Sequence, residues 1–193
     1  MRRATLVLLA ASLLAASVDM PASAATCRDI QFPDSVKVGS SELALNGLGI
    51  RKATLLRIKV YVAGLYVPKK ATDGAAILSA NGRWRLVLHF VRDVDASDIR
   101  DAFHDGFEKA AGDKLGALEK RIAALNAQVV DLKTGQSLTF TRDPAIGVTV
   151  DVNGKGGSTI EGADFADALL AIWIGAKPPN EDLKTGLLGG ACE

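Results

Sequence analysis

Aliphatic and polar side chains alternate within residues 45–68, the stretch around which the rest of the chain is organised. Every second residue from 56 to 62 is aliphatic: Leu56, Ile58, Val60 and Val62. A period of two is typical of a β-strand with one buried face, so we expect a long strand with these side chains in the core. Pro68 is expected to end the strand, because proline has no N–H to donate to a neighbouring strand.

A shorter extended run, residues 42–45, precedes this strand, and Gly47 and Gly49 follow it closely. Glycines within a strand pattern indicate a bulge or a bend in the backbone. We therefore expect a hairpin or a bulged corner in this region, with Arg51 close to its turn.

The rest of the chain predicts further strands and helices from their two different periods. The expected strands are residues 30–32, 35–38, 83–90, 137–141, 147–152 and 156–160. The expected helices are residues 72–80, 95–111, 114–128, 162–175 and 181–188, with N-caps at Thr72 or Asp73, at Asp95 and at Asn180. Short turns join most neighbouring strands, which favours antiparallel pairing. The predicted fold class is therefore α+β, a twisted antiparallel sheet with helices packed on one side.

The first 24 residues have the pattern of a secretory signal peptide. Arg2 and Arg3 precede an apolar segment, residues 6–18, that is short for a bilayer span, and residues 22–24 fit a small-residue cleavage site. An uncleaved anchor and a lipid-modified Cys27 are the weaker readings. We expect residues 25–193 to form one domain, without an integral membrane segment after cleavage, in the periplasm or outside the cell.

The charge balance argues against two classes of partner. The chain carries 23 Lys and Arg against 22 Asp and Glu, a net charge of +1, and removal of residues 1–24 brings it close to neutral. Nucleic-acid binding proteins and polybasic membrane proteins carry a clear excess of positive charge. We therefore expect no nucleic-acid partner.

The two cysteines, Cys27 and Cys192, lie near opposite ends of the expected domain. An oxidising compartment favours a disulfide between them, and two free or intermolecular thiols are the alternative. In the chain-entropy model, closure of so long a loop stabilises a protein by roughly 4–5 kcal/mol at most. The distance between the cysteines and the small number of histidines argue against a structural zinc site.

Several segments resemble the chalcone isomerase-like family. These are residues 46–51, 59–67, 88–93, 172–175 and 182–189, and it is their order and spacing together that match the family. The resemblance covers about residues 30 to 190. It implies an open-faced β-sandwich with a layer of helices, which agrees with the α+β fold predicted from the periodicity.

The resemblance also implies a site. The family contains plant enzymes that close a chalcone to a flavanone, and non-catalytic fatty-acid binding proteins. The family's key arginine falls on Arg51, and a tyrosine of the fatty-acid binders falls on Tyr61. The arginine holds the substrate oxyanion in the enzymes, and with the tyrosine it holds the ligand carboxylate in the binders. Both roles fit a guanidinium, whose parallel N–H donors match a carboxylate or an oxyanion.

This chain departs from the enzymes at several positions. The plant enzymes have a catalytic tyrosine in the helix after the strand at 88–93, whereas residues 94–111 contain none. They also have a threonine where this chain has Tyr61, and a polar residue near Ile172. We therefore expect a non-catalytic binding protein for a fatty acid or a similar amphipathic carboxylate, without a cofactor, in which Arg51 and Tyr61 hold the head group.

Three alternatives stay open. The first is an isomerase, an intramolecular lyase that uses Arg51 as its electrophile. The second is haem binding through His89 or His104, although both histidines fit a structural or solvated role better and no Cys-x-x-Cys-His motif is present. The third is a structural or interaction protein with a closed pocket. Without the resemblance, Arg51 reads as a charge at a hairpin turn, and Tyr61 becomes a pocket residue only if a second layer covers its face of the strand.

Overall fold

The structure is a computed structural model that describes residues 24–54 and 56–193. The expected signal peptide, residues 1–24, lies outside the described residues except for its last position.

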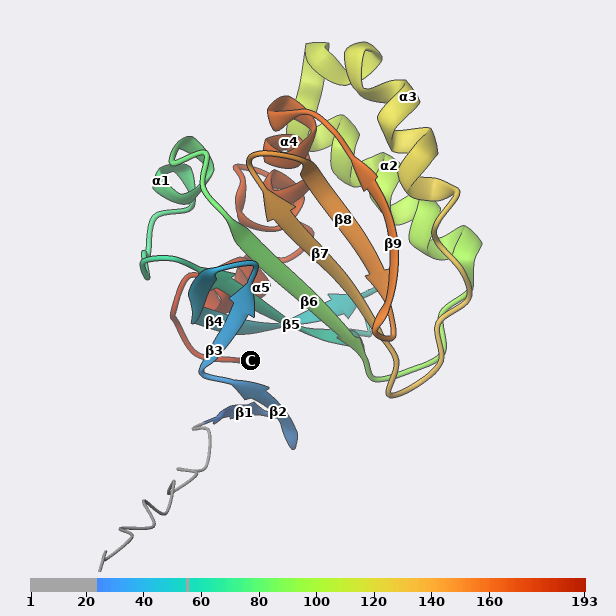
Figure 1. Cartoon of the computed structure of the whole chain (residues 1–193). Coiled ribbons are helices and arrows are strands. Elements are labelled where there is room, and N and C mark those ends of the chain that lie inside the picture. The colour runs from blue at the N-terminus through green and yellow to red at the C-terminus, as the bar shows by residue number, and fades with distance from the viewer. Residues whose placement is uncertain (1–23, 55) are drawn as a thin grey trace, which may run out of the picture.

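Seven strands form one antiparallel sheet in which every strand pairs with its neighbours in the sequence (Figure 1). Their order is β3 (Ser35–Val38), β4 (Ser41–Ala53), β5 (Ile58–Val67), β6 (Trp84–Phe90), β7 (Ser137–Asp143), β8 (Gly147–Val152) and β9 (Lys155–Ile160). A separate hairpin contains β1 (Ala24–Cys27), which the periodicity did not indicate, and β2 (Ile30–Pro33). The antiparallel pairing predicted from the short turns is confirmed.

The helices pack on one side of this curled sheet, as the α+β prediction requires (Figure 1). They are α1 (Gly74–Ser79), α2 (Ala96–Ala111), α3 (Leu115–Asn126), α4 (Ala163–Ile174) and α5 (Glu181–Leu187), and a short 3₁₀ turn, Gly112–Lys114, separates α2 from α3. Asp73 caps α1 as expected, because its carboxylate accepts from the backbone N–H of Ala75 at 2.9 Å.

The main core lies between the sheet and the helices. Phe103 of α2, Phe140 of β7 and Trp173 of α4 meet at its centre, with ring centroids 5.8 to 6.2 Å apart. A smaller core lies on the opposite face of β4 and β5, where Phe32 of the β1–β2 hairpin packs against Gly64. Burial of apolar surface on both faces explains why β5 is almost continuously buried from Tyr61 onwards.

The glycine pair before Arg51 has a different role from the expected bend. Strand β4 continues through Gly47 and Gly49, and its pairing with β5 shifts register at two other places, between Leu45 and Gly47 and between Arg51 and Lys52. A Cβ atom at Gly47 would collide with the carbonyl oxygen of Gly186, and one at Gly49 with that of Leu183. The two glycines therefore allow the backbone of α5 to lie directly on β4.

The expected burial is wrong at the start of the long strand. Leu56 is 82% exposed and Ile58 is 37% exposed, whereas Val62 is buried as predicted. The reason is that β5 begins only at Ile58, and the N–H of Arg57 donates to the carbonyl of Thr54 in a turn. The alternation of aliphatic and polar residues therefore begins at Leu56, before the first residue of the buried strand.

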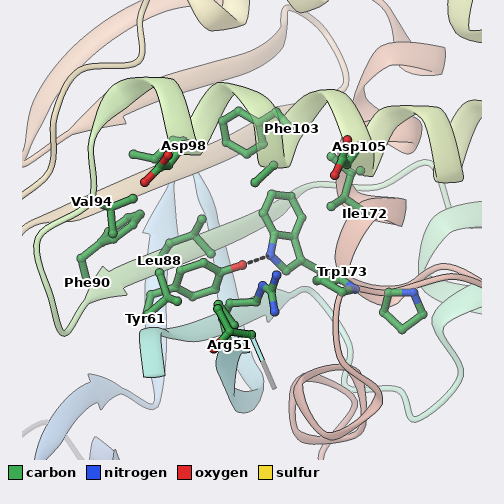
Figure 2. Close-up of a pocket in the computed structure, with 18 of the residues that line it drawn as sticks. Arg51, Tyr61, Leu88, Phe90, Val94, Asp98, Phe103, Asp105, Ile172 and Trp173 are labelled. Atoms are coloured by element: carbon green, nitrogen blue, oxygen red, sulfur yellow. Dashed lines mark hydrogen bonds between the residues drawn. The ribbon is translucent and has the colours of Figure 1, made fainter. Parts of the chain in front are cut away.

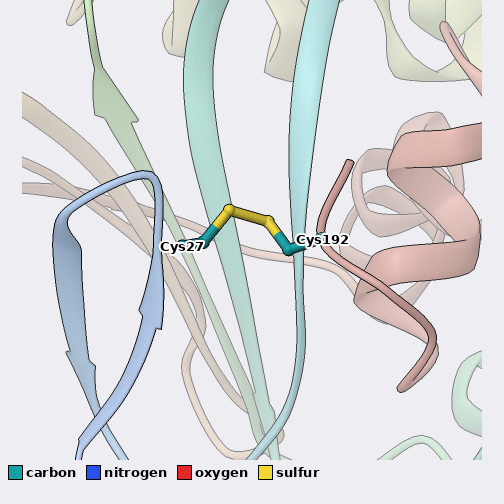
Figure 3. Close-up of a disulfide and its surroundings, with 2 residues drawn as sticks. All are labelled: Cys27 and Cys192. Carbon is teal, nitrogen blue, oxygen red and sulfur yellow. A yellow bond between two sulfur atoms is a disulfide. The ribbon is translucent and has the colours of Figure 1, made fainter.

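The expected disulfide is present between Cys27 and Cys192 (Figure 3). Their Cα atoms lie 6.1 Å apart, within the range of ordinary disulfides. The bond attaches β1 to the segment that follows α5, across 165 residues of sequence. Over the described part of the chain, the helices are too short or too polar to cross a membrane.

Candidate functional site

A cavity of about 500 Å³ lies between the sheet and α2 (Figure 2). Its apolar lining includes Tyr61 of β5, Leu88 and Phe90 of β6, Ile99 and Phe103 of α2, and Ile172 and Trp173 of α4. Charged residues complete the lining: Arg51, Arg92, Asp93, Asp98, Asp105, Lys109 and Lys177. A cavity of this size that combines an apolar wall with charged groups can take a small amphipathic ligand.

Arg51 and Tyr61 both belong to this cavity. They are direct partners in the antiparallel pairing of β4 with β5, so their side chains leave the sheet on the same face. Helices α2 and α4 cover that face, so Tyr61 meets the condition for a pocket residue, which was that a second layer covers its side of the strand. The structure therefore brings together the two residues that the family resemblance selected (Figure 2).

Tyr61 is held by one buried hydrogen bond. Its side chain is 9% exposed, and its hydroxyl oxygen accepts from Nε1 of Trp173 at 2.8 Å. Burial raises the pKa of Tyr61 to about 12, although the hydrogen bond from Trp173 and the charge of Arg51 act in the opposite direction. Tyr61 is therefore a neutral phenol at pH 7, and because Trp173 occupies its oxygen as a donor, the phenolic proton is directed elsewhere.

Within the described residues, only Nη1 of Arg51 donates hydrogen bonds, so Nε and Nη2 are available to a ligand. Its Nη1 donates to the carbonyl of Lys52 and to Oδ1 of Asn180, the latter at 3.0 Å. Among residues 24–54 and 56–193, no carboxylate lies within ion-pair distance of Arg51. A partly buried guanidinium without an anionic partner is unfavourable, and an anion in the cavity would remove this penalty.

Asn180 positions Arg51, a role that sequence reasoning missed. Asn180 stands at the N-cap of α5 as expected, but its side chain makes no capping hydrogen bond. Its Oδ1 instead accepts from Nη1 of Arg51 and from the backbone N–H of Lys52, at 3.0 and 2.9 Å. Neither periodicity nor motif indicates this contact, because it depends on how α5 lies on β4.

Nearby basic residues of the β4–β5 hairpin pair with α5 and do not enter the cavity. Nη2 of Arg57 and Nζ of Lys52 contact Oδ2 of Asp182 at 2.6 and 3.3 Å. Lys52 and then Arg57 hold the pKa of Asp182 below its usual range. Arg57 and Lys59 are absent from the lining.

The two histidines lie outside the cavity lining. Nδ1 of His89 is 3.2 Å from Oγ of Ser137, and burial lowers the pKa of His89. His104 is exposed on α2, where its ring, Asp105 and Glu108 bring three ligand atoms within 4.8 Å of one another. Exposed groups of this kind are common on helix surfaces.

The comparisons with known proteins agree with this architecture. The sequence profile of chalcone isomerase-like proteins matches residues 24–189. A crystal structure of a fatty-acid binding protein from Arabidopsis thaliana superposes with a TM-score of 0.71 at 17% sequence identity, over 86% of this chain and 96% of that one, which shows a shared fold. No curated protein sequence matches the chain. Because the profile spans most of its length, the protein belongs to the chalcone isomerase-like family.

Proposed function

We propose that this protein is a non-catalytic binding protein for a fatty acid or a similar amphipathic carboxylate. The observation that carries the proposal is the guanidinium of Arg51, which has no ion-pair partner among the described residues and lies opposite Tyr61 at the wall of the cavity. In this proposal Arg51 and Tyr61 hold the carboxylate head group, and the apolar tail lies among residues such as Phe90 and Phe103.

The chemistry of the two side chains fits an anionic head group. Arg51 offers a permanent positive charge and N–H donors in a plane, the arrangement that suits the two oxygens of a carboxylate. Tyr61 adds a neutral O–H donor, because its oxygen already accepts from Trp173. A ligand carboxylate would also give Arg51 an ion-pair partner, because Asp93, Asp98 and Asp105 line the cavity but none of them forms an ion pair with Arg51 among the described residues.

The family supports the same class of ligand. The Arabidopsis thaliana protein that shares the fold is a fatty-acid binding protein. The plant enzymes' catalytic tyrosine still has no counterpart in residues 94–111, and the one tyrosine of the cavity lining is Tyr61. We infer binding without turnover from this combination.

The proposal includes export from the cytoplasm. The pattern of residues 1–24 is that of a signal peptide, and a disulfide such as Cys27–Cys192 persists in an oxidising compartment. N-terminal sequencing of the protein recovered from the periplasm or the medium should begin at residue 25. Recovery from the cytoplasm with residues 1–24 attached would contradict this part of the proposal.

The ligand is tested by mass spectrometry of organic extracts from the purified protein. We expect a stoichiometric fatty acid or similar carboxylate that is lost in Arg51→Ala. The weaker binding should correspond to roughly 1.5–3 kcal/mol, the contribution of a hydrogen bond to a charged group. Arg57→Ala is the matched control, since it removes the same charge from the same hairpin outside the cavity.

Two results would count against the proposal. Equal affinity of wild type and a folded Arg51→Ala variant for a fatty acid would remove Arg51 as the head-group residue. Turnover of a chalcone above the spontaneous rate, lost in Arg51→Ala, would show an isomerase instead of a non-catalytic binder.

A further inference from the structure

Helix α2 forms one wall of the cavity with side chains of very different size. Its buried residues Ile99 and Phe103 belong to the main core, and both also line the cavity. Ala102 lines the same cavity but is exposed. Gly106 lies one turn further along α2 and lines the cavity as well. Over this turn, the face of α2 that holds Ala102 and Gly106 carries nothing larger than a methyl group.

Packing between helices accounts for Gly106 but not for Ala102. A Cβ atom at Gly106 would lie 2.8 Å from Cγ2 of Ile172, so glycine is required there for α2 to approach α4. Ala102 is exposed instead, and its methyl group borders the open space of the cavity. Exposed alanines are common on helices because alanine is the best helix former, but this one faces a candidate ligand site. A larger side chain at position 102 would occupy volume that a ligand could use.

Ala102 lies across the cavity from the proposed head-group site. Arg51 and Tyr61 stand on the strands, and Asp98 and Asp105, which flank Ala102 on α2, stand on the helix that faces them (Figure 2). An apolar tail gains nothing beside an exposed carboxylate. A tail that begins at Arg51 and avoids both aspartates therefore meets α2 between them, at Ala102.

A tail in this position would remove apolar surface from water on both walls of the cavity. Ala102 is exposed and Val60 of β5 is only partly buried, and both line the cavity. The rings of Phe90 and Phe103 complete the apolar lining near them. Burial of such surface is the main driving force for binding an acyl chain.

We propose that the tail of the amphipathic carboxylate lies across the methyl group of Ala102, and that the small size of this residue sets the longest tail that the cavity accepts. This inference rests on the proposed function. Each methylene group that leaves water contributes about fourfold to affinity. Ala102→Leu adds three carbon atoms in the path of the tail and should displace its far end. Long-chain acids should therefore lose roughly tenfold or more in affinity, while acids whose tails end before position 102 keep theirs.

Isothermal titration calorimetry with saturated fatty acids from octanoate to palmitate tests the effect on chain length. The affinity of the wild type should rise along the series, and that of Ala102→Leu should follow it for short acids and fall behind for long ones. Ala123→Leu is the matched control, since Ala123 is exposed on α3 and lies outside the cavity lining. It should follow the wild type throughout. Urea denaturation of the two leucine variants shows whether each is folded.

Protection of an introduced thiol tests the position of the tail directly. Both cysteines of the chain are joined in the disulfide, so Ala102→Cys introduces the single free thiol of the protein. We expect bound palmitate to slow the reaction of this thiol with a maleimide by roughly tenfold or more in proportion to the fraction of protein that is occupied. The thiol of Ala123→Cys should react at the same rate with and without palmitate.

Three results would overturn the inference. One is palmitate binding that leaves the labelling rate of Ala102→Cys unchanged or slows Ala123→Cys by the same factor, because the tail would then lie elsewhere. Another is an Ala102→Leu variant whose affinity changes equally at every chain length, or at none. The third is a wild type that binds no saturated fatty acid of any length. That result also removes the proposed function, whereas the first two leave it standing.

Discussion

Arg51 of β4 and Tyr61 of β5 face each other directly across the antiparallel pairing, and each is fixed by a residue from a helix that follows much later in the chain. Asn180 at the start of α5 accepts from Arg51, and Trp173 of α4 donates to Tyr61. The strands thus place the two polar groups together, and the C-terminal helices set their orientation.

The contact between Asn180 and Arg51 predicts that a negative charge at position 180, on a side chain of nearly the same shape, weakens ligand binding. Asn180→Asp places a carboxylate where the amide oxygen lies 3.0 Å from Nη1 of Arg51. We expect this carboxylate to compete with the ligand's and to weaken fatty-acid binding by roughly 1.5–3 kcal/mol. Displacement of a fluorescent fatty acid measures the affinity.

Asn180→Ala is the companion variant, since it removes the contact without adding charge. Its effect should be smaller than that of Asn180→Asp, because Arg51 loses a positioning partner but gains no competitor. Tighter binding in Asn180→Asp than in the wild type would contradict an anionic head group at Arg51.

Tyr61 predicts a loss of stability at high pH. Burial raises its pKa from 10.0 to about 12, so the folded protein holds the phenolic proton more tightly than the unfolded chain does. The resulting stabilisation is complete below pH 10 and disappears as the pH rises from 10 to 12. Its size is on the order of 3 kcal/mol at most for a shift of this magnitude.

Urea denaturation at a series of pH values checks this, and Tyr61→Phe is the comparison that isolates Tyr61 from the lysines that titrate nearby. Near pH 7 the variant should be less stable by roughly 1–3 kcal/mol, because it leaves Nε1 of Trp173 buried without an acceptor. Between pH 10 and 12 the difference should shrink. A constant difference would mean that the tyrosine does not titrate in this window.

The sequence predicted the α+β architecture because its signals are local. Strand alternation, the short turns and the capping residue Asp73 each depend on neighbours within a few positions. The candidate pair Arg51 and Tyr61 came from family resemblance instead, and the structure adds that the two residues share a cavity.

What the sequence did not predict depends on contacts between distant segments. Leu56 is in phase with the core residues of the strand. Burial also requires another element to cover that face, and alternation along one strand does not predict where such cover ends. Asn180 has the residue type of a helix cap, and only the packing of α5 on β4 turns its side chain toward Arg51. Gly47 and Gly49 looked like a bend, because a glycine required for a close helix contact has no signal of its own.

The disulfide predicts a coupling between redox state and the stability of the fold that holds the site. Cys27–Cys192 holds the segment that follows α5, and α5 supplies Asn180 to Arg51. Cys27→Ser with Cys192→Ser should lower the free energy of unfolding by roughly 2–5 kcal/mol. Chemical denaturation with and without a reductant measures this, and the reductant should change the wild type but not the double variant. No change in the wild type on reduction would contradict it.

The approach of α5 to β4 predicts that Gly49 is required for ligand binding although it has no polar group. In Gly49→Ala the new methyl group meets the carbonyl of Leu183, so α5 must move away from the strand. Overpacking of this kind destabilises proteins by roughly 1–3 kcal/mol, and the displaced Asn180 would no longer hold Arg51. We therefore expect both the free energy of unfolding and the affinity for a fatty acid to fall.

Gly116→Ala is the control for the glycine substitution, because a Cβ atom at Gly116 in α3 meets nothing within 4 Å. Alanine is the better helix former by about 1 kcal/mol, so this variant should be as stable as the wild type or more stable, with unchanged ligand affinity. If Gly49→Ala lowered stability but left affinity untouched, α5 would serve the fold alone, and the positioning of Arg51 would have to come from β4 itself.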